Sequence, residues 1–302
     1  MSAIELLGLG AVAIDHLIYI NAFPRPDQRT RVIRQEQQCG GLTATALVAA
    51  ARLGVRCAYA GVLGEDELSH AAVRCLQNEG INLDYLARLP DARPVNSTII
   101  IDQTHGTRNI FCDMNGVIGA AQDWPPEEII RSSAVLFVDA VGLPGMIRAA
   151  RIARQAGIPV VADVETDSPL FPELLAEIDH LILSWGFAQR VSGAETPAIA
   201  ATHFWTANRQ VVVITCGADG CWYLAGQGLA IHIPAYPVEV VDTTGCGDIF
   251  HGAYAAGLIK GLDLAERLRY ASAAAAIKAM TCGGQAGAPT RQALEAFIKA
   301  RN

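Results

Sequence analysis

Several motifs that would assign this 302-residue chain to a familiar enzyme class are absent. No Gly-x-x-x-x-Gly-Lys-Ser/Thr run occurs, which excludes a P-loop NTPase, and neither a protein-kinase signature set nor a His-Glu-x-x-His motif is present. The eight cysteines include no Cys-x-x-Cys pair, so the spacing typical of a cysteine metal site is missing. We therefore expect most of the cysteines to be reduced thiols in the core.

Long apolar runs and clusters of basic residues are also absent. No apolar run reaches the roughly 18 residues that a membrane span needs, although the mean hydropathy is high, at +0.27. The first residues have neither a basic start nor a long apolar core, so we expect no signal peptide and a cytoplasmic location. A net charge of −7 without a dense Lys/Arg run argues against nucleic acid as a partner. A small-molecule ligand is favoured instead.

The residues that are present predict one large α/β domain over 1–302. With 51% hydrophobic and 18% charged residues, the chain can bury a large core. Strands are expected at 4–9, 58–62, 135–139, 158–163, 180–184 and 211–215, and helices at 44–53, 66–79, 144–155, 249–260 and 264–280. Strands that alternate with helices of ten or more residues predict a mostly parallel sheet with helices on both faces.

Two segments depart from this alternation. Residues 16–37 and 96–112, the latter with a turn at His105–Gly106, alternate like exposed strands and predict a small separate sheet. A small sheet formed by two segments that leave the main domain would suit a lid that excludes water from a cleft. The alternative is an edge used for a homodimer, and both roles are compatible because an exposed sheet needs covering.

The most informative segment is 240–253, where a glycine turn leads into an Ala-rich helix. Valines in 238–241 predict a buried strand before the turn. Free amides and the positive end of the helix dipole would let Gly245, Cys246 and Gly247 hold an anion. Asp248 could accept a proton from a hydroxyl while the amides stabilise a phosphoryl group in transfer.

Other interpretations of Asp242, Cys246 and Asp248 stay open at this point. Asp242 and Asp248 could be ordinary helix-capping residues. Cys246 could be a reactive thiolate stabilised by the helix N-terminus, or simply a small residue whose amide matters.

A competing glycine pattern occurs near the start of the chain. Gly8-x-Gly10-x-x-Ala13 matches a dinucleotide-binding fingerprint, which requires a following helix. Residues 13–20 are instead predicted to be a strand, so we interpret the match as accidental.

Other polar residues lie where a ligand site would need them. Asp15 follows the first strand and could bind two sugar hydroxyls, or serve as a turn residue. Gly40 and Gly41 precede a helix whose first turn contains Thr45, which offers a hydroxyl, although this is also an ordinary helix start. Arg108 on the expected lid could reach an anionic group. Residues 215–220 are expected to form a glycine turn after a strand, which could contact the edge of a nucleotide or be the turn of a hairpin.

These residues resemble those of the ribokinase-type (PfkB) carbohydrate kinases along nearly the whole chain. The second signature of that family, Asp-Thr-x-Gly-Ala-Gly-Asp, is similar to residues 242–248, with Cys246 in the usual alanine position. The first signature is similar to 40–54, followed by 61–66. The resemblance implies a ribokinase-like fold with a small β-sheet lid.

The resemblance also implies residue roles and cofactors. Asp248 would be the base, with Gly245, Cys246 and Gly247 as the anion hole. Sugar contacts would come from Asp15, Gly40, Gly41, Thr45 and Arg108. Nucleotide contacts would come from Thr215, Gly217, Gly220 and Gly284. Asp242 and Thr244, with the loop 281–287, correspond to a monovalent-cation site, so ATP, Mg²⁺ and K⁺ are the expected cofactors.

The chain departs from the family pattern at two places. Thr45 replaces an asparagine that contacts the sugar, which argues against ribose-like recognition, and residues 184–187 replace an Asn-x-x-Glu motif tied to magnesium. Within the family the chain most resembles sulfofructose kinases, with a weaker likeness to ketohexokinases. We therefore expect phosphorylation of a primary hydroxyl of a small ketose. The alternatives are a nucleoside or sugar-phosphate kinase, a non-catalytic sugar or nucleotide sensor, and a NAD oxidoreductase.

Overall fold

The main body of the protein is an α/β sandwich built on an eight-stranded sheet. The computed structural model describes residues 4–105 and 107–301. The strand order is β14-β13-β12-β11-β10-β9-β1-β4. These strands are β1 (Leu6–Leu9), β4 (Cys57–Tyr59), β9 (Val135–Val138), β10 (Val160–Asp163), β11 (His180–Ser184), β12 (Val211–Thr215), β13 (Cys221–Leu224) and β14 (Ile231–Ile233). All neighbours from β4 to β12 are parallel, and only β13 and β14 are antiparallel.

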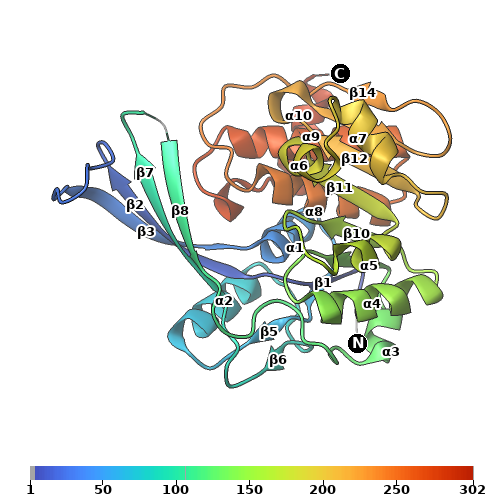
Figure 1. Ribbon diagram of the computed structural model, residues 1–302, viewed down its shortest axis with the longest axis horizontal. Helices are drawn as coiled ribbons and strands as arrows, with labels where there is room; N and C mark the ends of the chain where they lie inside the picture. Colours follow the sequence, from blue (N-terminus) through green and yellow to red (C-terminus); the bar gives the residue numbers. More distant parts are fainter. Residues whose placement is uncertain (1–3, 106, 302) are drawn as a thin grey trace.

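Helices cover both faces of this sheet (Figure 1). One face packs against α1 (Leu42–Arg52), α2 (Glu67–Asn78), α8 (Cys246–Ile259), α9 (Leu264–Ala279) and α10 (Arg291–Lys299). The other packs against α3 (Glu127–Arg131), α4 (Leu143–Gln155), α5 (Phe171–Ala176), α6 (Trp185–Ser192) and α7 (Pro197–Phe204). Short 3₁₀ turns occur at η1 (Gly217–Asp219) and η2 (Gln285–Gly287). The expected α/β architecture is confirmed.

Strand alternation explains why both faces are covered. In β9, Phe137 packs with the α1/α8/α9 layer, whereas Leu136 and Val138 pack with the α4–α7 layer. Successive side chains of a strand point to opposite faces, so a strand buried on both sides must be apolar throughout. No helix in the described residues is both long and apolar enough to cross a bilayer.

A second sheet of four strands projects from one side of the body (Figure 1). Its order is β3-β2-β7-β8, made of β2 (Ala13–Ile20), β3 (Val32–Gly40), β7 (Val95–Asp102) and β8 (Thr107–Asp113). The central pair β2/β7 is parallel and the outer pairs are antiparallel. A two-stranded sheet, β5 (Val62–Leu63) with β6 (Ala87–Arg88), lies near its base. Of the turn expected at His105–Gly106, Gly106 lies outside the described residues.

Two sequence-based expectations are wrong. No strand forms at 238–241, where Val240 and Val241 are exposed. Their apolar side chains line a cavity instead of filling the core. Cys39 and Cys75 form a disulfide, so these two are not reduced thiols, and Cys112 and Cys282 are exposed instead of core residues.

Candidate active site

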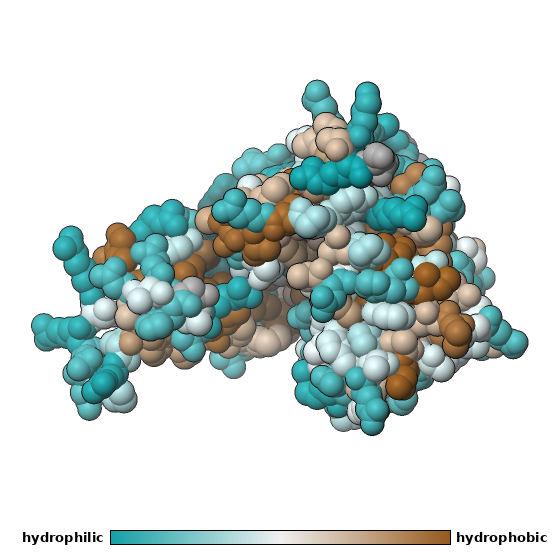
Figure 2. Space-filling view, turned by 90° about the horizontal axis from the view of Figure 1, so that it is seen from above, coloured by the Kyte–Doolittle hydropathy of each residue, from teal (hydrophilic) through white to brown (hydrophobic). Residues whose placement is uncertain are grey.

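A cavity of about 370 Å³ lies between the four-stranded sheet and the C-terminal part of the body. Figure 2 shows the molecule hollowed between these two parts. One wall is the inner face of the four-stranded sheet, with Asp15, Leu17 and Tyr19. The opposite wall consists of 240–244 and 282–284. The cavity therefore joins segments that are more than 200 residues apart in the sequence.

Next to the second wall, the start of α8 presents free backbone amides. Gly245 caps the helix in the left-handed region, with φ 76°. The Cys246 amide donates to the Thr243 carbonyl at 3.2 Å. Among the described residues, the amides of Gly245, Gly247 and Asp248 donate to no acceptor. Three such donors at the positive end of a helix can bind an anion, so this turn is the candidate anion site.

Asp248 is the third residue of α8 and does not cap it. The helix begins at Gly245 without a side-chain cap. The carboxylate accepts no hydrogen bond from the described residues. Burial and the nearby carboxylates, first Asp163 and then Glu165, raise the pKa of Asp248 well above its usual value. Asp248 thus has no structural partner among the described residues, and its raised pKa makes its ionised form a stronger base, as a proton acceptor requires.

Both carboxylate oxygens of Asp139, by contrast, accept hydrogen bonds that hold a turn. Its Oδ2 accepts from the Ala11 amide at 2.6 Å and the Thr43 hydroxyl at 2.8 Å, and its Oδ1 accepts from Val141. Burial raises its pKa to about 6. A Cβ on Gly10 would lie 2.2 Å from Asp139 Oδ2, so glycine is needed there for this packing. The second glycine of the dinucleotide-like pattern, Gly10, is therefore explained by its close packing against Asp139.

Asp15 lies on β2 and lines the cavity, as the sugar contact expected at this position would require. Burial raises its pKa, and a hydrogen bond with Ser97 opposes this. A Cβ on Gly40 would lie 2.2 Å from Asp15 Oδ2. Gly41 has φ 93°, and a Cβ there would collide with the Ala11 carbonyl at 2.6 Å. The glycine pair thus lets the start of α1 approach Asp15 and the end of β1.

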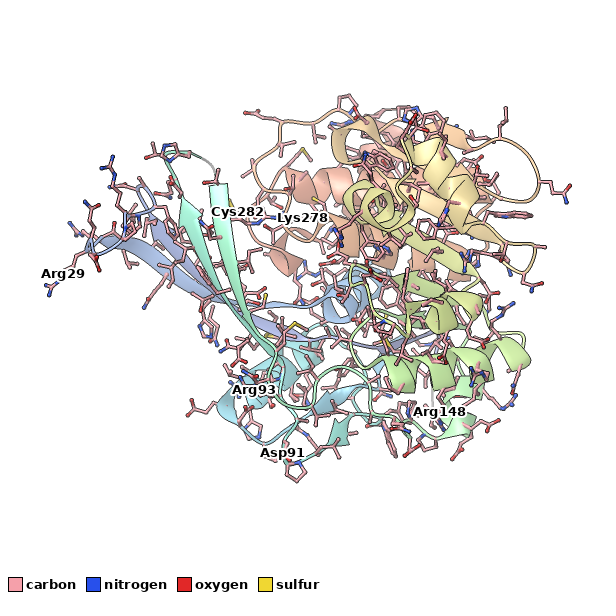
Figure 3. The ribbon with its side chains drawn as sticks, viewed as in Figure 1. Arg29, Asp91, Arg93, Arg148, Lys278 and Cys282 are labelled. Atoms are coloured by element: carbon pink, nitrogen blue, oxygen red, sulfur yellow. A yellow bond between two sulfur atoms is a disulfide. The ribbon has the colours of Figure 1, made fainter. Side chains whose placement is uncertain are left out.

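The two remaining expected sugar contacts differ in position. Arg108 on β8 lines the cavity. Burial raises the pKa of Cys246, which begins α8 next to the candidate anion site, and the charge of Arg108 acts to lower it. Thr45 is buried, its hydroxyl accepts from Gln285 Nε2 at 3.3 Å, and it is not among the residues that line the cavity. Arg29 lies at the outer end of the four-stranded sheet (Figure 3), remote from this site.

Asp242 and Thr244 belong to the cavity wall, where Asp242 binds two loops together. Its Oδ1 accepts from the Thr244 amide and its Oδ2 from the Gly283 amide, both at 2.8 Å. Lys278 Nζ donates to the Asp242 carbonyl at 2.7 Å. Hydrogen bonds to Thr244 and Gly283 lower the pKa of Asp242, although burial opposes them.

The expected nucleotide contacts fall into two groups. Gly284 lines the cavity and packs directly against Gly245. Thr215, Gly217 and Gly220 lie around the end of β12, at the carboxyl edge of the main sheet, but not among the cavity-lining residues. Gly220 has φ 87°, and a Cβ there would lie 2.1 Å from the Ile233 carbonyl. The structure does not join these three residues to the cavity.

Two further observations bear on the chemistry of the site. Burial raises the pKa of Cys246, which disfavours a reactive thiolate at that position. Sequence reasoning missed the carboxylates Asp139 and Asp163 around Asp248. Both lie at the carboxyl end of a buried parallel strand, so the rule that identified Asp15 could have found them.

Comparison with known proteins agrees with this geometry. The profile of pfkB family carbohydrate kinases matches residues 5–291. A ribokinase from Haemophilus influenzae is 27% identical over 300 residues, covering 96% of this chain and 97% of the relative. An aminoimidazole riboside kinase from Salmonella typhimurium is 28% identical, covering 87% and 88%. The structure of Arabidopsis thaliana ribokinase complexed with ribose and ATP has a TM-score of 0.87 at 24% identity, covering 98% and 99%, and shows the shared fold.

Proposed function

The chain belongs to the pfkB family of carbohydrate kinases, and from that premise we propose that it transfers the γ-phosphoryl group of ATP to a primary hydroxyl of a small ketose bound at Asp15. The observation that carries the proposal is Asp248, which is free of hydrogen bonds from the described residues and adjoins three free amides at the start of α8. A base and an anion site are what phosphoryl transfer to an alcohol requires.

In the proposed reaction, Asp248 accepts the proton of the sugar hydroxyl as that oxygen attacks the γ-phosphorus, and the bond from the γ-phosphorus to the bridging oxygen breaks to release ADP. The raised pKa makes the ionised carboxylate a stronger base. The amides of Gly245, Gly247 and Asp248 bind the transferring group. Arg108 brings a positive charge from the four-stranded sheet to the same place. Magnesium, carried mainly by the nucleotide and water, would neutralise phosphate charge.

The ketose proposal rests on Thr45. Its hydroxyl is buried and already bonded to Gln285, so it offers no replacement for an asparagine amide contact to the sugar. Sugar recognition then falls to Asp15, whose carboxylate can accept from two adjacent hydroxyls. The named relatives include ribokinases and a riboside kinase, so ribose and nucleosides are the necessary competitors.

A coupled ADP-release assay over a substrate panel tests this function. Fructose and other ketohexoses should give turnover with ATP and magnesium, at higher kcat/KM than ribose, nucleosides or sugar phosphates. A preference for ribose would reject the ketose while keeping the kinase. Binding of sugar and ATP without ADP release from any member would indicate a sensor and reject the kinase proposal.

We further propose that the four-stranded sheet acts as a lid and joins two copies in a homodimer. Strands β3 and β8 expose large apolar side chains: Val32, Ile33, Ile110 and Phe111. Exposed apolar sheet surface of this kind is normally covered by a partner. Light scattering on the purified chain should give twice the monomer mass, and the double variant Ile110→Lys/Phe111→Lys should shift it to monomer. A monomeric wild type would reject the dimer.

A further inference from the structure

Lys278, on the last turn of α9, is a lysine with no exposed surface next to the candidate active site. Its ammonium donates to the Asp242 carbonyl at 2.7 Å and to the Thr281 carbonyl at 3.0 Å, and it lies 3.8 Å from Asp242 Oδ2. A buried charge is costly unless it is paired and hydrogen-bonded. Here two carbonyls and a carboxylate supply that compensation.

Carbonyl and carboxylate oxygens of this kind are also the ligands that a hard cation would use. Asp242 and the loop 281–287 are the segments in which the sequence suggested a K⁺ site. The ammonium of Lys278 already lies among their oxygens, so the described residues do not fit a separate monovalent ion there. Gly287 provides the space, because a Cβ at that position would lie 2.6 Å from Lys278 Cδ.

The position of Lys278 connects it to the anion site. Val241 and Asp242 donate their amides to the Ala279 carbonyl, next to Lys278. Asp242 in turn binds the amides of Thr244 and Gly283. These contacts fix the two loops that flank Gly245. The lysine charge also acts on Cys246, the first residue of α8. In Figure 3, Lys278 and Cys282 lie on the side of the body that faces the four-stranded sheet.

We propose that Lys278 is a built-in monovalent cation: its ammonium holds the loops at the start of α8 and supplies the positive charge there, so the protein works without K⁺. This inference rests on the proposed kinase function only for its activity readout. Lys278 is a positioning residue, because it acts through Asp242 and the loop 281–284.

The matched comparison uses two lysines of the same chain. Lys278→Ala removes the ammonium and leaves room for an ion. Lys260→Ala is the control, because Lys260 also donates to a main-chain carbonyl, that of Leu53 at 2.8 Å, but at the far end of α8. Each protein is melted in tetramethylammonium chloride and in KCl or NH₄Cl of equal concentration. A cation that binds only the folded state raises Tm.

We expect KCl and NH₄Cl to raise the Tm of Lys278→Ala and to leave the wild type and Lys260→Ala unchanged. A wild type stabilised by K⁺ over tetramethylammonium would overturn the proposal whether or not the protein proves to be a kinase. A folded Lys278→Ala that does not respond to either cation would also overturn it.

Activity gives the second readout. Turnover of the wild type should be equal in K⁺ and tetramethylammonium. That of Lys278→Ala should fall about tenfold to a hundredfold in tetramethylammonium, and K⁺ or NH₄⁺ should restore part of it. Full activity of the variant without either ion, or strong K⁺ activation of the wild type, would contradict the inference. If Lys278→Ala does not fold, the comparison of the wild type in K⁺ and in tetramethylammonium still tests the proposal.

Discussion

His251 Nδ1, on α8, lies 3.2 Å from Asp163 Oδ2 at the end of β10, and both side chains are almost fully buried. The same nitrogen is 2.8 Å from the Gly247 carbonyl, and Nε2 is 3.1 Å from the Ile182 carbonyl. Burial lowers the pKa of His251 and raises that of Asp163. The imidazole therefore ties the first turn of α8 to the end of β10 and the middle of β11 in the main sheet.

Replacing His251 should loosen this turn. His251→Ala would leave buried polar groups without partners, and we expect a loss of about 2–4 kcal/mol in the free energy of unfolding, with a lower kcat. Urea denaturation and steady-state kinetics measure both. His251→Gln is the matched variant, because its amide can still bond one carbonyl, and it should lose less. Equal stability of His251→Ala and the wild type would contradict the positioning role.

Replacing Asp248 should affect turnover more than binding. Asp248→Asn removes the proposed base but keeps the size of the side chain, so kcat should fall by about two to four orders of magnitude. Sugar affinity, measured by calorimetry, should stay within a few fold, because Asp15 is intact. Asp242→Asn serves as the comparison, since it should lower stability through its loop contacts as well as activity. Near-normal turnover in Asp248→Asn would rule out this base.

Much of the fold could be predicted from local pattern. The apolar runs at 180–184 and 211–215 match β11 and β12 at both ends, because parallel strands buried on both faces are apolar throughout. The period-two alternation after residues 16 and 96 likewise predicted the four-stranded sheet. The strand predicted at 238–241 does not form. Val240 and Val241 line a cavity, and composition does not distinguish a cavity wall from a core.

The candidate site was predictable where a local pattern carries it. Asp248 and its glycines lie within a single turn, and their spacing singles them out as candidates. Asp163 lies at the carboxyl end of β10, where the rule that singled out Asp15 applies. Lys278 is brought to the site by the packing of α9, which no local pattern encodes. The Cys39–Cys75 bond has the same origin, because it joins the end of β3 to α2 across 36 residues.

That disulfide gives a stability prediction. Closing a loop of this length lowers the entropy of the unfolded chain, so reduction should cost about 3–4 kcal/mol of unfolding free energy. Urea denaturation with and without a thiol reductant measures the difference. Cys75→Ser should match the reduced wild type and show no further response to reductant. Cys112→Ser, an exposed free thiol, is the control and should retain the full reductant effect. Identical wild-type curves under both conditions would contradict a disulfide in solution.

His180 predicts how stability depends on acid. The ring is buried at the start of β11, its Nδ1 lies 2.9 Å from the Tyr254 hydroxyl, and burial lowers its pKa to about 3. In the unfolded chain the pKa is near 6.5, so below that pH the unfolded state binds the extra proton. The contribution of this group is therefore fully present above pH 6.5 and is lost as pH falls towards 3, by about 1.4 kcal/mol per pH unit. Raised carboxyl pKa values such as that of Asp139, at about 6, act in the opposite direction, because the folded state then binds more protons.

The variant His180→Phe isolates the histidine, since it keeps an aromatic ring but cannot titrate. Denaturation between pH 7 and pH 4 should show the wild type losing more stability than the variant, and parallel pH profiles would contradict a depressed pKa at this position.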